Sequence, residues 1–147
     1  MKWSILICTL ENRKHFLERL LNILLPQIGE YAVECDVYTG AVEIRILRDN
    51  KEMAVGEKRN KLIHMAQGEY FSFIDDDISD DYIQTLLTAS KDVMTFKTAQ
   101  YINGVFNKDV IYSTTKGNKN RDDYYIRWAN AICCWRTEFA RGIRYGN

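Results

Sequence analysis

A short apolar segment that runs directly into three aspartates constrains the fold of this chain more than any other feature. Residues 70–74 read Tyr-Phe-Ser-Phe-Ile, and Asp75, Asp76 and Asp77 follow at once. Aromatic and β-branched residues favour a packed strand. Adjacent carboxylates repel one another unless they face different ways or bind a cation. Since side chains alternate along a strand, we expect Asp75 and Asp77 on one face and Asp76 on the other.

Two interpretations of these aspartates are open from the residues alone. Two carboxylates at a strand end form an all-oxygen site suited to Mg²⁺ or Mn²⁺, with part of the metal shell left to substrate phosphates. Alternatively, the acids form a turn before a helix, because the segment 79–81, Ser-Asp-Asp, resembles an N-cap.

Composition sets the broad class of the protein. The 147 residues suit one domain with its own core, and 20 basic residues balance 20 acidic ones. The totals therefore carry no nucleic-acid or membrane signal. We expect neither a signal peptide nor a transmembrane segment, and we expect a cytoplasmic location. The four cysteines and two histidines form no metal-binding motif, so we expect reduced thiols and no zinc.

Strand and helix patterns alternate through the first part of the chain. Strands are predicted at 3–8, 42–47 and 70–74, and helices at about 13–25 (ending at Pro26), from Gly56 to Gly68, and at about 80–89. Periodicity does not settle whether residues 31–39 form a strand. This order predicts an α/β sandwich with a mostly parallel sheet. Open sheets of this kind bind ligands beyond the carboxyl ends of their strands, where polar residues collect here: Thr9, Glu11, Asp49 and Asp75 to Asp77.

The second half is rich in β patterns. Asn103-Gly104 lies between two such segments, 93–102 and 105–114, and predicts a hairpin. Residues 116–123 are polar and are expected to form a mobile loop. An apolar, aromatic segment at 126–135 and a short helix at 137–141 complete the chain.

Together these residues resemble a family-two glycosyltransferase with the GT-A fold, and the viral and phage branch is the most similar. The matching residues are Thr9 to Arg13, Asp49, Gly56-Glu57-Lys58-Arg59-Asn60, Ala66-x-Gly68-Glu69-Tyr70 and Asp75-Asp76-Asp77. Residues 3–90 match well and the remainder more loosely. No single piece of this pattern is specific, whereas the combination is.

The resemblance implies a fold and an activity. The fold is a GT-A Rossmann-like α/β sandwich with a mostly parallel central sheet, helices on both faces and a β-hairpin in the second half. One domain, 1–147, would comprise a nucleotide-sugar-binding half (1–90) and a partial acceptor half (91–147), truncated at its C-terminus. The activity is metal-dependent transfer of a sugar, with inversion, from a nucleotide-diphosphate sugar such as a UDP-sugar to an acceptor hydroxyl. A viral origin would place it in the host cytoplasm.

The resemblance also implies roles for individual residues. The nucleotide-binding set is Thr9, Glu11, Asp49, Lys58, Arg59, Asp75 and Asp76, and the set that binds Mn²⁺ or Mg²⁺ is Asp75 and Asp77. Lys58 and Arg59 lie by a helix start, where cations and free N–H groups favour a diphosphate. By analogy with the family, Arg59 is the better candidate of the two. Each assignment has a structural alternative. The alternatives are an early-helix acid for Glu11, a solvated neighbour for Lys58, a helix cap for Asn60, core packing for Tyr70 and Phe73, and core or acceptor pocket for Trp128 and Trp135.

The pattern lacks the catalytic base of an inverting enzyme. In the family this base comes from an acidic pair downstream of a segment that resembles residues 130–141. Asp122 and Asp123 are adjacent acids, but they precede that segment. Three explanations of the missing base are open. The chain is a fragment, the base comes from another residue or subunit, or the chain is a non-catalytic nucleotide-sugar-binding module. A nucleotidyltransferase fits less well, because residues 8–12 contain no glycine for a phosphate loop.

Overall fold

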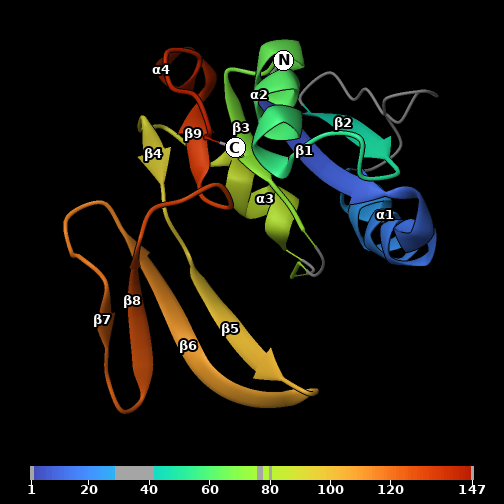
Figure 1. Ribbon diagram of the computed structural model, residues 1–147. Coiled ribbons are helices and arrows are strands. Elements are labelled where there is room, and N and C mark those ends of the chain that lie inside the picture. Colours follow the sequence, from blue (N-terminus) through green and yellow to red (C-terminus); the bar gives the residue numbers. More distant parts are fainter. Residues whose placement is uncertain (1, 29–41, 76–77, 80, 147) are drawn as a thin grey trace.

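The computed structural model describes residues 2–28, 42–75, 78–79 and 81–146, and Figure 1 shows two sheets with helices gathered around the first. The first sheet contains β1 (Trp3–Leu10), β2 (Val42–Asp49), β3 (Tyr70–Phe73), β4 (Val93–Met94) and β9 (Cys134–Arg136). The second contains β5 (Lys97–Ile102), β6 (Val105–Ser113), β7 (Lys119–Asn120) and β8 (Tyr124–Trp128). The helices are η1 (Glu11–Arg13), α1 (Lys14–Ile28), α2 (Val55–Met65), α3 (Tyr82–Leu87) and α4 (Thr137–Ala140).

The central sheet is mostly parallel, as predicted. Its order is β2-β1-β3-β9-β4, and β1 pairs in parallel with both β2 and β3. β9 runs antiparallel to its neighbours β3 and β4. The chain therefore leaves this sheet for the second one and returns to it through β9.

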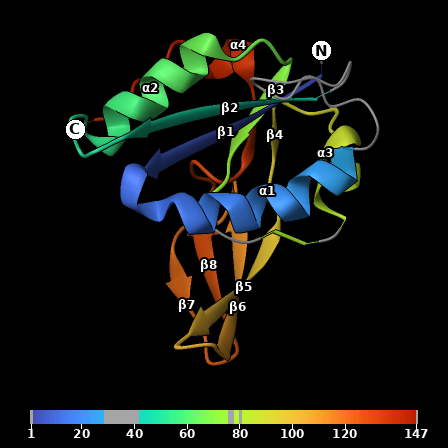
Figure 2. The same cartoon turned by 90° about the vertical axis from the view of Figure 1, so that its right-hand side faces the viewer.

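Helices cover both faces of the central sheet, which confirms the predicted sandwich (Figure 2). Because side chains alternate along a strand, each strand contributes to two separate cores. On the α1 and α3 face the core includes Trp3, Ile5, Ile7, Leu20, Leu24, Tyr70 and Leu86. On the α2 and α4 face it includes Leu6, Leu62, Ile63, Phe71, Phe73 and Ala140.

A buried acid links the end of α2 to β1 and β2. It lies at the end of the sheet opposite the carboxyl ends of the parallel strands. Glu43 of β2 is fully buried and accepts hydrogen bonds from the Ser4 hydroxyl, the Gln67 backbone N–H (2.6 Å) and Arg45 Nε (2.8 Å). Gly68 lies against β1 so closely that a Cβ there would be 2.6 Å from the Ser4 nitrogen. The end of α2 is thus held against β1 and β2 by polar contacts.

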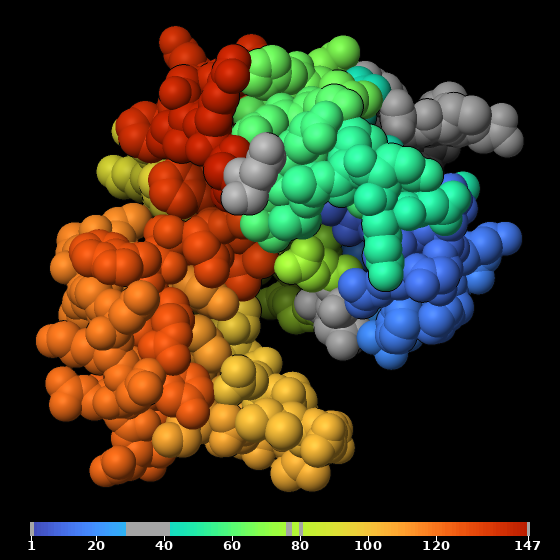
Figure 3. Space-filling model, in the orientation of Figure 1, coloured from blue at the N-terminus to red at the C-terminus, as the bar shows by residue number. Residues whose placement is uncertain are grey.

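The second half builds the predicted hairpin. Asn103 and Gly104 both have positive φ, 50° and 79°, as a two-residue hairpin turn requires. β5 and β6 form the hairpin, and β8 and β7 extend it into a sheet that projects from the helical body (Figure 3). The polar segment 116–123 is not wholly a loop, because β7 within it pairs with β8.

α1 extends beyond the end that was predicted for it. The helix continues past Pro26 to Ile28, although Pro26 has no N–H to donate to the carbonyl one turn earlier. Gln27 Nε2 donates to the Ile23 carbonyl at 3.2 Å in this last turn. Residues 31–39 lie outside the described residues. The cysteines with described positions, Cys8, Cys133 and Cys134, are free. Among the helices of the described residues, none has the length and apolar character needed to cross a bilayer.

Candidate functional site

The carboxyl ends of β1, β2 and β3 bring several of the predicted site residues to one edge of the sheet. The register pairs Leu10 with Asp49, so Thr9 and Asp49 end neighbouring strands. Asp75 follows β3 directly and is exposed. The first turns of α2, which follow β2, place Lys58 and Arg59 over the same edge. The alternation of the strands sets Asp49, Phe73 and Asp75 on the face that α2 covers.

Asp49 and Lys58 form a buried ion pair beneath this edge. Their side chains are 7% and 5% exposed, and the Lys58 ammonium also donates to the Thr9 carbonyl at 3.2 Å. Asp49 further accepts from the backbone N–H groups of Met53 (3.0 Å) and Lys51 (3.2 Å). Burial acts to raise the pKa of Asp49, but the bonds from Lys58 and the two N–H groups outweigh it, and the pKa lies below its ordinary value.

This pair corrects one interpretation made from the sequence. Lys58 is not a solvated neighbour of Arg59, because it is 4% exposed and bound to two groups. The two consecutive cations of the motif thus differ in what they do in this structure. Lys58 braces α2 against β1 and β2, and Arg59 faces the cavity described below.

We predict that the ion pair of Asp49 with Lys58 makes the free energy of unfolding fall as the solution is acidified. A carboxyl whose folded pKa lies below its ordinary value of 3.8 stabilises the protein above about pH 4, and this contribution is lost as the pH falls through the folded pKa. The wild-type protein should therefore exceed Asp49→Asn in free energy of unfolding at about pH 6, and the gap should narrow at about pH 3. Urea unfolding at both pH values measures the gap, and a constant gap would contradict the assignment.

Glu11 lies at the rim of this edge. It belongs to η1, and its carboxylate pairs with Arg48 Nε at 3.0 Å. Both side chains are partly exposed, 45% for Glu11 and 39% for Arg48. The structure therefore places Glu11 next to the end of β2, where its carboxylate already has a cationic partner.

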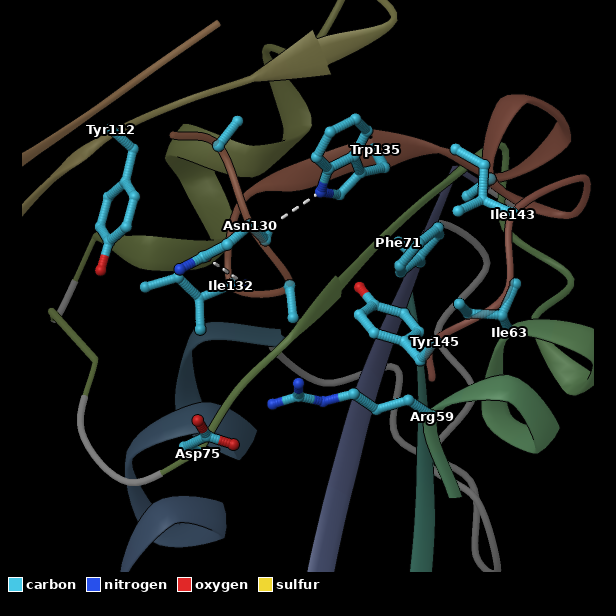
Figure 4. Close-up of a pocket in the computed structure, with 13 residues that line it drawn as sticks. Arg59, Ile63, Phe71, Asp75, Tyr112, Asn130, Ile132, Trp135, Ile143 and Tyr145 are labelled. Atoms are coloured by element: carbon cyan, nitrogen blue, oxygen red, sulfur yellow. Dashed lines mark hydrogen bonds between the residues drawn. The ribbon is translucent and has the colours of Figure 1, made fainter. Parts of the chain in front are cut away.

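A cavity of about 520 Å³ opens beside Arg59 and Asp75 (Figure 4). Figure 4 shows the guanidinium and the carboxylate pointing toward one another at one end of the cavity. The rest of the wall is largely apolar and aromatic: Ile63, Phe71, Tyr112, Ala129, Asn130, Ala131, Ile132, Trp135, Ala140, Ile143 and Tyr145. A largely apolar pocket with a few converging polar groups is the usual form of a small-molecule site.

Arg59 packs against two neighbouring aromatic rings. Its guanidinium lies 5.5 Å from the centre of the Phe73 ring and 5.4 Å from that of Tyr145. Its Nε is buried and has no acceptor among the residues that the structure describes. A guanidinium that keeps donors unused beside a cavity can bind an oxyanion, and its planar fork matches phosphate.

Cys8 lies on β1, and its thiol is partly buried. Burial raises the pKa of its thiol to about 11, and the nearby Arg59 charge offsets this only in part. The thiol therefore stays protonated at neutral pH, and a protonated thiol neither attacks nor binds a metal well. Burial likewise raises the pKa of Tyr145, so the phenol beside Arg59 is neutral.

Sequence reasoning missed part of this wall. Tyr145, Asn130 and Tyr112 line the cavity but belong to no motif. Trp135 lines it as well, in line with one of its two interpretations, and its indole N–H donates to the Asn130 carbonyl at 2.9 Å.

The remaining aromatic candidates do not line this cavity. Trp128 is exposed and packs near Gly117 instead, whereas Tyr70 and Phe73 are each 2% exposed and belong to the cores. No local signal distinguishes a tyrosine of the cavity wall from one of the core.

Of the two predicted metal ligands, Asp75 lies within the described residues. Asp76 and Asp77 lie outside the described residues, and within the described ranges no three acidic, histidine or cysteine side chains cluster. Asp75 supplies an exposed carboxylate at the cavity. This fits Mg²⁺ or Mn²⁺, because such ions are often held by one or two carboxylates together with water and substrate phosphates.

Comparison with known proteins identifies the fold. Neither a family model nor a curated protein sequence matches the chain. Two solved structures are similar, both of S. aureus TarS 1–349, one in complex with UDP-GlcNAc and one with UDP. They superpose with TM-scores of 0.60 and 0.56, at 18% and 15% sequence identity over 99% of this chain. The chain spans 49% and 50% of those TarS chains. The likeness shows that this chain has the α/β fold of a protein that has been crystallised with a nucleotide sugar.

Proposed function

We propose that this chain binds a nucleotide-diphosphate sugar, most simply a UDP-sugar, and belongs to a metal-dependent inverting glycosyltransferase of GT-A fold. The observation that carries the proposal is that the Arg59 guanidinium and the Asp75 carboxylate line the same cavity. The Asp75 end of that cavity lies just past the carboxyl end of β3, and open α/β sheets bind their ligands at such strand ends. The shared fold with a UDP-GlcNAc-bound protein supports the same ligand class.

Each part of the donor has a group that suits it. The nucleoside would lie over Thr9, Glu11 and Asp49, where the strand ends and the rim supply donors and acceptors. The diphosphate would bind the Arg59 guanidinium, which faces the cavity and whose planar fork matches phosphate. Asp75, with Asp76, would lie by the ribose, and the apolar cavity would receive the sugar.

The proposed metal would be held by Asp75 and Asp77. Bound there, a divalent cation would supply charge neutralisation to the leaving nucleoside diphosphate. Arg59 would share that task, because a fixed guanidinium stabilises the charge that develops on the phosphates as the glycosidic bond breaks. The acceptor hydroxyl would reach the sugar through the cavity.

The first experiment is calorimetric titration of UDP, GDP and ADP into the protein, with Mn²⁺ and then with EDTA. We expect selective binding of UDP that depends on the metal. Asp77→Ala should remove the metal-dependent gain in UDP affinity and leave the folded circular dichroism spectrum unchanged. Retention of the Mn²⁺ effect in Asp77→Ala would rule out this metal assignment, and absence of binding by any diphosphate would overturn the proposed function.

A non-catalytic nucleotide-sugar-binding module is the second candidate. The observation in its favour is that Asp75 is the single acid among the described residues that line the cavity, so no second carboxylate stands ready there as a general base. Donor hydrolysis and transfer assays distinguish the two: the module would bind UDP and metal normally and would turn over no donor.

A further inference from the structure

Residues 141–146, which we call the strap, run back along α2 from its end to its start. At the end of α2, Arg141 Nη2 donates to the Ala66 carbonyl at 2.7 Å. In the middle, the Asn60 side chain bonds the backbone of Tyr145 twice: its Nδ2 donates to the Tyr145 carbonyl at 3.1 Å, and its Oδ1 accepts from the Tyr145 N–H at 2.9 Å. At the start of α2, a Cβ added to Gly56 would overlap the Gly146 carbonyl oxygen.

These contacts place one ring of the strap on the cation of the candidate site. The ring of Tyr145 lies 5.4 Å from the Arg59 guanidinium and packs edge-on against Phe73 at 6.1 Å. Figure 4 shows Tyr145 directly beside the Arg59 side chain, which extends from there toward Asp75. Asn60 and Arg59 are neighbours on α2, so the residue that holds the strap adjoins the residue that the strap covers.

From this arrangement we infer that Asn60 and Tyr145 are positioning residues for Arg59. Asn60 fixes the backbone of Tyr145, and the Tyr145 ring, packed edge-on beside Phe73, holds the guanidinium in the orientation that faces Asp75 and the cavity. The inference rests on the proposed function, because it assigns the held guanidinium to the diphosphate of the donor. Gly56 begins the segment Gly56-Glu57-Lys58-Arg59-Asn60. Its lack of a side chain lets the strap lie against the start of α2.

The physical reason is preorganisation. Arginine is among the side chains that lose most rotamer freedom when they are fixed. A protein that fixes Arg59 before binding avoids that loss when the phosphate arrives. If the freed side chain occupies the binding orientation about a tenth of the time, the dissociation constant for UDP rises about tenfold. Uridine has no phosphate, so its affinity should not change.

The test combines two variants that break different contacts. Tyr145→Leu removes the ring and keeps the backbone that Asn60 bonds, whereas Asn60→Ala removes both hydrogen bonds and keeps the ring. Tyr145→Phe keeps the ring contact and is the conservative control. Arg144→Ala, at an exposed position of the same strap, is the matched control.

The first readout needs no ligand. In a proton–nitrogen NMR spectrum of the whole chain, the Arg59 Nε–H signal is identified by its loss in Arg59→Lys. Two rings pack against Arg59, so we expect a shifted signal in the wild type and in both controls. In Tyr145→Leu and Asn60→Ala it should move to the position of exposed arginines. An unchanged Arg59 signal in those two variants would overturn the inference, whatever the protein binds.

The second readout is titration with UDP and with uridine in the presence of Mn²⁺. Tyr145→Leu and Asn60→Ala should weaken UDP about tenfold and leave uridine within about twofold. Equal losses for both ligands, or none, would show that the strap is only structural. If the wild type binds no diphosphate, the proposed function and the assignment of Arg59 to phosphate fail together. The NMR result then decides separately whether the strap holds Arg59.

Discussion

Arg59→Ala should weaken UDP binding by about 10- to 100-fold and leave uridine binding nearly unchanged. Hydrogen bonds to charged groups contribute about 1.5–3 kcal/mol each, and every 1.4 kcal/mol is a factor of about ten in affinity. The Arg59 guanidinium faces the cavity beside Asp75 (Figure 4), so the loss of this cation should fall on the phosphates. Calorimetric titration of UDP and uridine with Mn²⁺ gives both dissociation constants.

Two controls separate loss of the phosphate contact from loss of charge or fold. Arg59→Lys keeps the charge and loses the planar fork, so it should lie between the wild type and Arg59→Ala. Lys61→Ala removes an exposed cation from the same helix, where it pairs with Glu57 at 3.1 Å, and should bind as the wild type does. Equal losses of UDP and uridine in Arg59→Ala would place Arg59 away from the phosphates.

The predictions that succeeded rest on local patterns. The strand at 70–74 and the Asn103-Gly104 hairpin were both predicted to within a few residues, because a run of aromatic and β-branched residues indicates a buried strand and Asn-Gly indicates a two-residue turn with positive φ. Elements defined by distant partners were harder. β9 comprises only Cys134–Arg136, and it is a strand because it pairs between β3 and β4. A segment of three residues carries no pattern that predicts this pairing.

The residues of the candidate site also fall into two groups: those that strand order predicts and those that depend on distant contacts. Parallel strands bring their carboxyl ends to one edge, so Thr9, Asp49 and Asp75 could be expected near one another from strand order alone. The burial of Lys58 against Asp49 depends on how α2 packs over β2, which no spacing rule specifies. The contact of Asn60 with Tyr145 joins residues 85 apart in the chain. Such contacts are set by tertiary packing, and a single sequence carries no signal for them.

The largest expected loss of stability comes from Glu43, whose position in an alternating strand gives no hint of its burial. Glu43→Ala should lower the free energy of unfolding by about 3–5 kcal/mol, the usual result of removing one partner from a buried charged pair. The carboxylate is 0% exposed and accepts from Ser4, Gln67 and Arg45. Urea unfolding followed by circular dichroism measures the loss.

The controls test whether the hydrogen bonds or the charge of Glu43 matter. Glu43→Gln keeps one acceptor oxygen for the Ser4 hydroxyl and the Gln67 N–H. It loses both the charge and the acceptor opposite Arg45 Nε, so its loss should still be smaller than that of alanine, which keeps no acceptor. Glu57→Ala removes an acid that is exposed and pairs within α2, and should cost less than about 0.5 kcal/mol. Because Glu43 lies away from the edge that carries Arg59 and Asp75, the folded fraction of Glu43→Gln should bind UDP as tightly as the wild type does. A loss of UDP affinity in that variant would mean that the two edges of the sheet are coupled through α2.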